Sequence, residues 1–317
     1  MPNAEWKWKR PNEKFFDGAG EPFYFTPSRT LIVRGKLASF FRSEKQWLRR
    51  APLPRTYTDY LGRKLFTVLL TAQGIGAFAL ITLAVIVRKF NVASAVIHPM
   101  TRREIVRAGV RLLPMYLFVA VALGFLAIGQ TVAVAARLGA FDYIGTVMVT
   151  VIVRELGPLV SAVLALARVG TANVIELGTG RALGSVEALE AAGIDPIHYL
   201  VVPKVIGMTL GVFSLTVYLI ITALASGYLF VFLQNAPLTP TKYFAELAIS
   251  LGWQDFVLLA VKSCAFGFFI GIVTCYHGLA QPLRLEDVSR VTVRATTECI
   301  FVCVLIDALF FVLYLRA

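Results

Sequence analysis

Long uncharged runs of apolar residues dominate the chain from residue 112 onward. About 20 apolar residues are enough for a helix to cross the hydrocarbon core of a bilayer. The runs therefore predict five membrane-spanning helices, at 112–136, 143–167, 205–233, 256–279 and 295–315. The strict alternation typical of strands is not evident in the sequence between them, so we expect an all-α, polytopic integral membrane protein.

An uncharged run of 23 residues, Leu65–Val87, comes before these spans and has basic residues on both sides. The preceding part of the chain holds 14 of the 31 Lys and Arg residues, and a further basic group starts at Arg88. Basic flanks favour the cytoplasmic side, so a single crossing cannot suit both. We expect an elbow helix over 61–90 that lies in the interface or dips into the membrane and returns, with a break near Gly74 and Gly76.

The distribution of basic residues also predicts the orientation and the domain division. The predicted inside loops carry six basic residues and the outside loops two, which places the N-terminus in the cytoplasm. We divide the chain into a basic, aromatic extension at 1–58, disordered or interfacial, and a membrane domain at 59–317. Apolar residues make up 57% of the chain and charged residues 16%. With that composition, the net charge of +12 indicates attraction to anionic lipid headgroups and no nucleic-acid partner.

Four ionisable residues lie in the interior of the predicted spans, away from the span ends: Arg154, Glu155, Lys262 and Asp307. A charge at the bilayer centre costs at least about 2.5–3.5 kcal/mol, so such residues usually pair or face a cavity. Helical rise would allow all four to meet in the outer half of the membrane. Two interpretations stay open: an electrostatic clamp between helices, or the polar lining of a lipid cavity in which Arg154 or Lys262 approaches a phosphate.

Gly157 and Pro158 follow this charged pair and are candidates for a kink or gate. Proline removes one backbone hydrogen bond and bends a helix. Transmembrane prolines are also common without a functional role.

The polar segment Glu176–Gly193 predicts one helix between the second and third spans. The succeeding sequence Gly193-Ile194-Asp195-Pro196 is a typical helix stop. Taken alone, the segment is better explained by a solvated loop helix than by a partner-binding one.

Several short motifs in order resemble one family. They are Arg154-Glu155-Leu156-Gly157-Pro158-Leu159, Ala167-Arg168-Val169-Gly170, Glu176-Leu177-Gly178-Thr179, Glu187-Ala188-Leu189, Gly193-Ile194-Asp195-Pro196 and Ser289-Arg290-Val291-Thr292-Val293-Arg294. Over about residues 60–317 the sequence resembles the MlaE/YrbE permeases, the membrane subunits of MCE-associated ABC lipid transporters. It departs from the family pattern at Gly180, where a methionine is common, and at Gly184 and Ser185, where a glutamate-glutamine pair is common.

The resemblance implies a homodimeric permease in the bacterial inner membrane, with an elbow helix, five spans and a cytoplasmic coupling helix at 176–193. It implies an ABC ATPase and an MCE-domain substrate-binding protein as partners, and it admits a small STAS-type accessory protein. Membrane lipid would be the substrate, moved between the inner membrane and the outer envelope. The residues it assigns to ATPase coupling are Glu176, Gly178, Arg181, Glu187, Glu190 and Asp195.

The sequence lacks the motifs of an enzyme. No phosphate-binding loop with the G-x-x-x-x-G-K-[ST] spacing is found, so ATP and Mg²⁺ would be bound by the partner ATPase. No metal site, cofactor or nucleophile-base arrangement is indicated. Two alternatives to a lipid permease stay open: an ion-coupled secondary transporter with Glu155 and Asp307 as proton relays, and a structural scaffold of the envelope.

Overall fold

The computed structural model describes residues 57–89, 94–138, 144–233, 240–279 and 284–316. The chain divides into two compact units, Met1–Thr67 and Val68–Ala317, and the description below concerns the second. The predicted extension at 1–58 lies, apart from its last two residues, outside the described residues.

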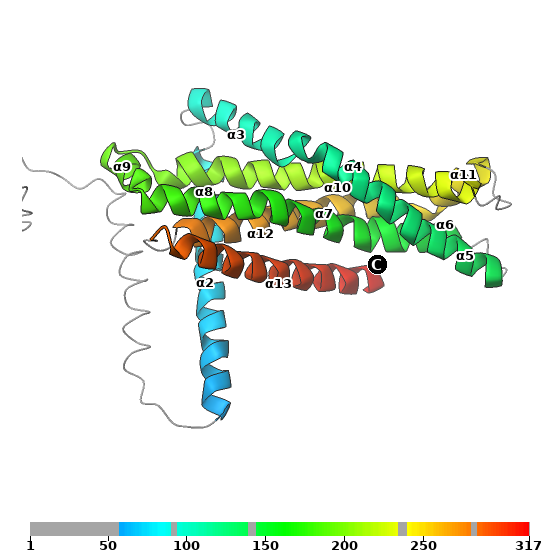
Figure 1. Ribbon diagram of the computed structural model, residues 1–317, viewed down its shortest axis with the longest axis horizontal. Helices are drawn as coiled ribbons and strands as arrows, with labels where there is room; N and C mark the ends of the chain where they lie inside the picture. The colour runs from blue at the N-terminus through cyan, green and yellow to red at the C-terminus, as the bar shows by residue number, and fades with distance from the viewer. Residues whose placement is uncertain (1–56, 90–93, 139–143, 234–239, 280–283, 317) are drawn as a thin grey trace, which may run out of the picture. The chain divides into compact units, whose positions relative to one another are not determined.

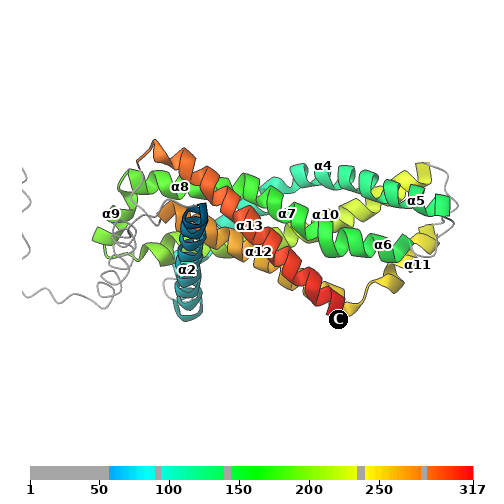
Figure 2. The ribbon, with the colours of Figure 1, turned by 90° about the horizontal axis from the view of Figure 1, so that it is seen from below.

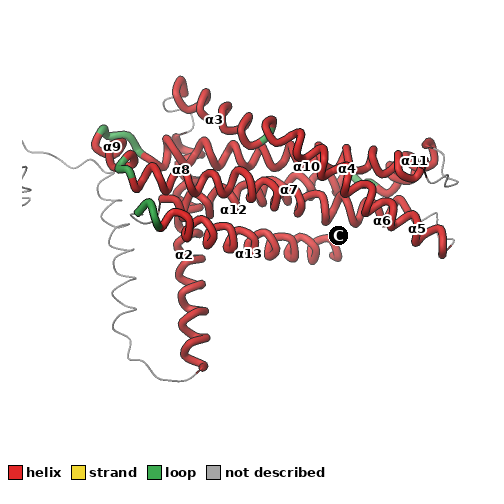
Figure 3. The backbone as a smooth tube through the Cα atoms, viewed as in Figure 1, coloured by secondary structure: helices red, strands yellow, loops and turns green. Residues whose placement is uncertain are grey.

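Every secondary-structure element in the described residues is helical, as Figure 3 shows. The α-helices are α2 (Tyr57–Lys89), α3 (Ser94–Ala108), α4 (Leu113–Leu123), α5 (Gly129–Leu138), α6 (Ile144–Met148), α7 (Gly157–Ala165), α8 (Thr171–Ala182), α9 (Ser185–Ala191), α10 (Val202–Leu233), α11 (Pro240–Ser250), α12 (Trp253–Leu279) and α13 (Asp287–Arg316). The predicted all-α class is thereby confirmed.

One short 3-10 turn and four π-helical stretches lie between these helices or at the start of one of them. They are η1 (Val110–Leu112), η2 (Gly124–Ile128), η4 (Val149–Leu156), η5 (Leu166–Gly170) and η6 (Ile197–Val201). As a result the described residues contain six helical stretches long and apolar enough to cross a membrane: Leu70–Arg88, Ile97–Val132, Gly145–Ala182, Ile197–Phe230, Trp253–Leu279 and Asp287–Tyr314.

The observed helices are longer than the predicted spans, mainly because they include polar residues at the ends of the apolar runs. Hydropathy located the cores of the spans, but α3 begins at Ser94, well before the predicted span at 112, and α12 begins at Trp253, three residues before the predicted span at 256. Charged residues on a helix that packs against protein do not end it, and α3 packs along α10. Helix α11 was not predicted from the sequence, because residues 234–255 were expected to form an outside loop.

The expected break near Gly74 and Gly76 is wrong, since α2 continues through both residues. Gly74 instead permits a close contact. A Cβ atom at this position would lie 2.6 Å from the hydroxyl oxygen of Tyr276 on α12. The ring of Phe78, one turn further along α2, meets Tyr276 edge to face with 5.8 Å between ring centroids.

Helix α10 is the centre of the second unit, and its closest neighbour is α12. Gly267 and Gly271 of α12 face it: a Cβ atom at Gly267 would lie 2.6 Å from the Cα atom of Thr209. A small-xxx-small pair lets two backbones approach closely, which is how helices associate in a membrane. These two glycines therefore act in packing.

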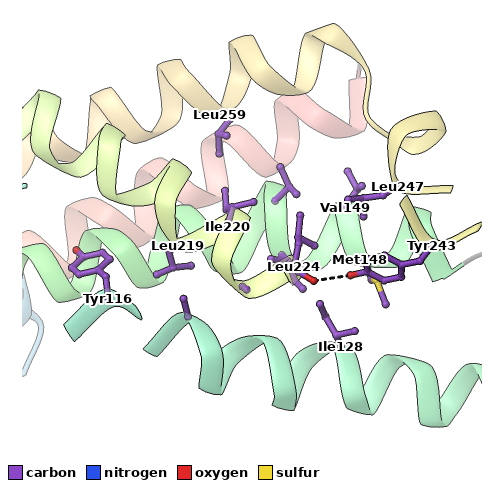
Figure 4. Close-up of a cluster of buried hydrophobic side chains, with 14 of the residues drawn as sticks. Tyr116, Ile128, Met148, Val149, Leu219, Ile220, Leu224, Tyr243, Leu247 and Leu259 are labelled. Atoms are coloured by element: carbon purple, nitrogen blue, oxygen red, sulfur yellow. Dashed lines mark hydrogen bonds between the residues drawn. The ribbon is translucent and has the colours of Figure 1, made fainter. Parts of the chain in front are cut away.

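A large apolar cluster joins α10 to α4, α6, α11 and α12 (Figure 4). Its polar edge is the hydroxyl of Tyr243 on α11, which donates a hydrogen bond of 3.1 Å to the carbonyl oxygen of Leu224. Burial raises the pKa of Tyr243, so the phenol stays a neutral donor. The cluster holds α11 against the end of α10.

Figures 1 and 2 show α9 at one end of this unit and α5, α6 and α11 at the opposite end. Helix α12 runs from the α11 end toward the α9 end, and α13 runs back in the other direction. The two candidate sites, a charge cluster inside the spans and the α8–α9 segment, lie at different positions along the long axis of these helices.

Candidate functional site

Lys262 on α12 is the centre of an intramembrane charge cluster. Its side chain is 0% exposed, and its ammonium nitrogen lies 2.8 Å from Asp307 and 3.3 Å from Glu155. The ammonium also donates a hydrogen bond of 2.8 Å to the backbone carbonyl oxygen of Arg154. Hydrogen bonds run from this ammonium to the Arg154 carbonyl and to Glu155, whereas Asp307 contacts it as an ion pair. The structure thus brings Lys262, Glu155 and Asp307 together.

Arg154 pairs with a residue that the sequence did not single out. Its Nε atom lies 2.8 Å from Asp255 of α12, and its Nη2 atom donates to the same carboxylate over 3.2 Å. The neutral quartet expected from the sequence is therefore a group of five. We call Arg154, Glu155, Asp255, Lys262 and Asp307 the intramembrane cluster.

Asp255 was missed because the hydropathy run begins at Phe256. The residue lies in the first turn of α12, where its carboxylate accepts a hydrogen bond of 3.0 Å from the backbone N–H of Gly252. That bond is half of a capping box, in which the third helical residue reaches back to the residue before the helix. A Gly-x-x-Asp start before an apolar run was the available signal.

Pro158 explains why a lysine can reach a backbone carbonyl here. Proline has no N–H to donate to the carbonyl four residues earlier, and that carbonyl belongs to Arg154. The π-helical stretch η4 lies directly before α7, in which Pro158 is the second residue. Gly157 lies at the same point, and a Cβ atom there would come within 2.6 Å of Ile220 on α10.

Tyr314, near the end of α13, lies beside both cations of the cluster. Its ring centroid is 5.3 Å from the guanidinium carbon of Arg154 and 6.0 Å from the ammonium of Lys262. Its hydroxyl oxygen is buried and has no hydrogen-bond partner among the described residues. The sequence offered no signal for Tyr314, because an aromatic residue near a span end is ordinary.

The predicted coupling segment forms two helices where the sequence indicated one over 176–193. Helix α8 ends at Ala182 and α9 begins at Ser185, with Gly184 between them at a φ of +78°. That backbone conformation suits glycine, which has no Cβ atom. The predicted stop at Gly193 is confirmed. Its φ is +77°, and the next N–H, that of Ile194, bonds back to the carbonyl of Leu189 as in a Schellman motif.

Glu176, one of the expected coupling residues, takes part in a second charge network. Its carboxylate lies 2.6 Å from Arg107 of α3 and 2.9 Å from Lys204 of α10. Glu104 of α3 completes the network at 3.4 Å from Lys204. Two acids and two bases balance, and Lys204 is 4% exposed. Glu176 therefore ties the base of the coupling segment to two other helices.

The other expected coupling residues have differing surroundings. Arg181 donates a hydrogen bond to the carbonyl of Leu279, the last residue of α12, and lies 4.0 Å from Glu187. The carboxylate of Asp195 accepts a hydrogen bond of 3.1 Å from the N–H of Ile197, which caps the next helix. Gly178 is buried, and Glu190 is partly exposed on α9.

No group of three or more metal-ligating side chains occurs among the described residues. The chain is a multi-pass helical membrane protein with a charge cluster inside its spans and a short two-helix segment at one end. The profile of the family described as Permease MlaE matches residues 101–313, and the chain belongs to that family. As a permease subunit of an ABC transporter it works with a separate ATPase and is not itself the catalytic subunit.

Curated relatives give the same class. A probable ABC transporter permease protein of Rickettsia typhi is 29% identical over 232 residues, which cover 72% of this chain and 86% of the relative. A similarly described protein of Synechocystis is 33% identical over 175 residues, covering 54% of this chain and 66% of the relative. Protein TRIGALACTOSYLDIACYLGLYCEROL 1, chloroplastic, of Arabidopsis thaliana is 28% identical over 202 residues, covering 62% of this chain and 55% of the relative.

Proposed function

We propose that this chain is the permease subunit of an MCE-type ABC transporter that moves phospholipid or a related lipid between the inner membrane and the outer envelope. A separate ATPase subunit supplies the energy. The chain would lie in the bacterial inner membrane with its N-terminus in the cytoplasm. Membership of the MlaE family supports this proposal, and one relative bears the name of a galactosylated diacylglycerol.

The observation that carries the proposal is the intramembrane cluster. Arg154, Glu155 and Asp307 keep 32%, 26% and 20% of their side chains exposed in the protomer. A lipid needs a polar partner for its headgroup and apolar surroundings for its acyl chains. Partly exposed charges between apolar spans offer both, and intramembrane ionisable residues are functional candidates by default.

The segment α8–α9 is suited to receive a force from an ATPase. It lies at one end of the second unit (Figure 1) and exposes the apolar side chains of Leu183 and Ile194. Its base is held by the Glu176 network, and Arg181 bonds to the end of α12. Movement of the α8–α9 segment would therefore reach α3, α10 and α12 through these contacts of α8.

Helix α2 is proposed to be the elbow helix at the membrane surface. Four of its residues, Ile75, Phe78, Ala79 and Ile86, pack on one apolar cluster that includes Val186 of α9 and Leu279 of α12. Residues 75 to 86 extend over about 17 Å of helix. If α2 were parallel to the neighbouring spans, its residues over that length would contact different levels of the helix bundle. Their contact with one cluster at the α9 end therefore favours an α2 axis that crosses the other helices at an angle.

The remaining partners follow from the family resemblance. We propose a homodimer of this chain, an MCE-domain substrate-binding protein and a small STAS-type accessory protein as the rest of the assembly. ATP and Mg²⁺ would be bound by the ATPase subunit.

Reconstitution tests the function. The chain, co-expressed with its ATPase and MCE-domain protein, is expected to purify as a complex and to transfer labelled phospholipid from proteoliposomes only when ATP is present. Lipid transfer driven by a pH gradient without ATP would point to the ion-coupled alternative. Full transport by the isolated chain would refute the proposal.

A further inference from the structure

The intramembrane cluster is not electrically neutral. It holds three carboxylates, Glu155, Asp255 and Asp307, against the two cations Arg154 and Lys262. With all five groups ionised there is a formal excess of one negative charge. Charges interact strongly in a medium of low dielectric constant, so this site favours an additional positive group.

The cluster also separates its charges by accessibility. Lys262 is 0% exposed and Asp255 is 6% exposed, so neither is accessible to a ligand. The partly exposed members are Arg154, Glu155 and Asp307. A ligand approaching the cluster therefore meets one cation and two acids.

Donors remain free on the cationic side. The Nη1 atom of Arg154 makes no hydrogen bond with any described residue. The hydroxyl of the neighbouring Tyr314 is buried and likewise has no hydrogen-bond partner among the described residues. Both groups can donate to a phosphate oxygen. On the acidic side, Glu155 and Asp307 share a single ammonium, that of Lys262, and each retains lone pairs for another donor.

From this arrangement we infer that the cluster recognises the zwitterionic headgroup of an amine-bearing phospholipid. The phosphate lies at Arg154 and Tyr314, and the ammonium lies at Glu155 and Asp307. A headgroup with a phosphate and no amine would add a second uncompensated negative charge and bind less well. This inference rests on the proposed lipid transport and adds the headgroup class to it.

Two lipids that differ only in the amine test the inference. The full chain with its ATPase is reconstituted in equal amounts of phosphatidylethanolamine and phosphatidylethanol with the same acyl chains. The complex is then extracted into detergent, and the retained lipids are quantified by mass spectrometry. One charge-assisted hydrogen bond corresponds to an enrichment of the amine lipid of about tenfold.

Variants locate the effect. Glu155→Gln and Asp307→Asn should bring the retained ratio close to that of the membrane, whereas Glu286→Gln, an exposed residue outside the spans, should leave it unchanged. Equal retention of the two lipids by the wild-type chain would overturn the inference, and this measurement does not depend on how the variants fold. Loss of ATP-driven lipid transfer for every lipid would instead overturn the proposed function.

Discussion

The ammonium of Lys262 donates a hydrogen bond of 2.8 Å to the backbone carbonyl oxygen of Arg154 on a different helix. That carbonyl is the one that Pro158 leaves without its usual i→i−4 donor. The proline and the lysine are separated by more than 100 positions in the sequence. They act as a pair, because the proline frees the acceptor that the lysine uses.

The substitution Pro158→Ala tests this pairing. An alanine N–H at this position would compete with Lys262 for the carbonyl of Arg154 and favour a regular α-helix in place of η4. We expect the variant to fold at least as stably as the wild type and to transport lipid more slowly. Thermal unfolding in detergent and ATP-driven lipid transfer measure the two effects. An unchanged transfer rate would show that the π-helical stretch η4 has no role in transport.

Removal of the Lys262 charge should destabilise the protein strongly. In Lys262→Met the carboxylates of Glu155 and Asp307 lose their shared cation. Breaking a buried ion pair on one side costs about 3–5 kcal/mol. The triple variant Lys262→Met, Glu155→Gln, Asp307→Asn has no unpaired charge at this point and should recover most of the stability. Chemical unfolding of the single and triple variants provides the comparison, and equal losses in both would contradict the ion-pair account.

Asp255→Asn tests the member of the cluster that the sequence did not reveal. The change removes the charge facing Arg154 and weakens the cap of α12, and a charged hydrogen bond of this kind contributes about 1.5–3 kcal/mol. The matched control is Asp287→Asn, an exposed aspartate in the first turn of α13, which should change the free energy of unfolding by less than about 0.5 kcal/mol. The prediction fails if the two variants unfold alike.

Two glycines of the proposed coupling segment should respond in opposite directions to alanine. Gly184 has a φ of +78°, and an L-residue in the left-handed region costs about 1–2 kcal/mol. Gly180 lies inside α8, where an added Cβ atom has no neighbour closer than 4.0 Å, so Gly180→Ala should stabilise the helix by about 0.5–1 kcal/mol.

Hydrogen exchange of the backbone amides in α9 measures the effect of both substitutions on the stability of this segment. Gly184→Ala should exchange faster there and co-purify with less ATPase, while Gly180→Ala should match or exceed the wild type. Faster exchange in Gly180→Ala would show that this position is packed against something other than the helix itself.

Several features could be predicted because they depend on local sequence alone. The spans at 205–233 and 256–279 end where α10 and α12 end, since an uncharged run followed by polar residues defines a membrane boundary without reference to other helices. The stop at Gly193 followed in the same way from the glycine and proline near it.

Other features could not be predicted because they depend on contacts between distant segments. The close contact of α2 with α12 at Gly74 depends on Tyr276, 202 positions later in the chain, whose hydroxyl occupies the space of a side chain at Gly74. The network around Glu176 depends on Arg107 and Lys204, which a sequence places in two unrelated segments.

The sequence by itself determined that this is a helical membrane protein with charges inside its spans, because insertion into a bilayer depends on the hydropathy of each segment. Only the tertiary structure decided which charges are partners. Asp255 pairs with Arg154. Lys262 pairs with Glu155 and Asp307 and donates a hydrogen bond to a backbone carbonyl. Pairing depends on the rotation and offset of packed helices, and neither quantity can be read from the residues of one helix.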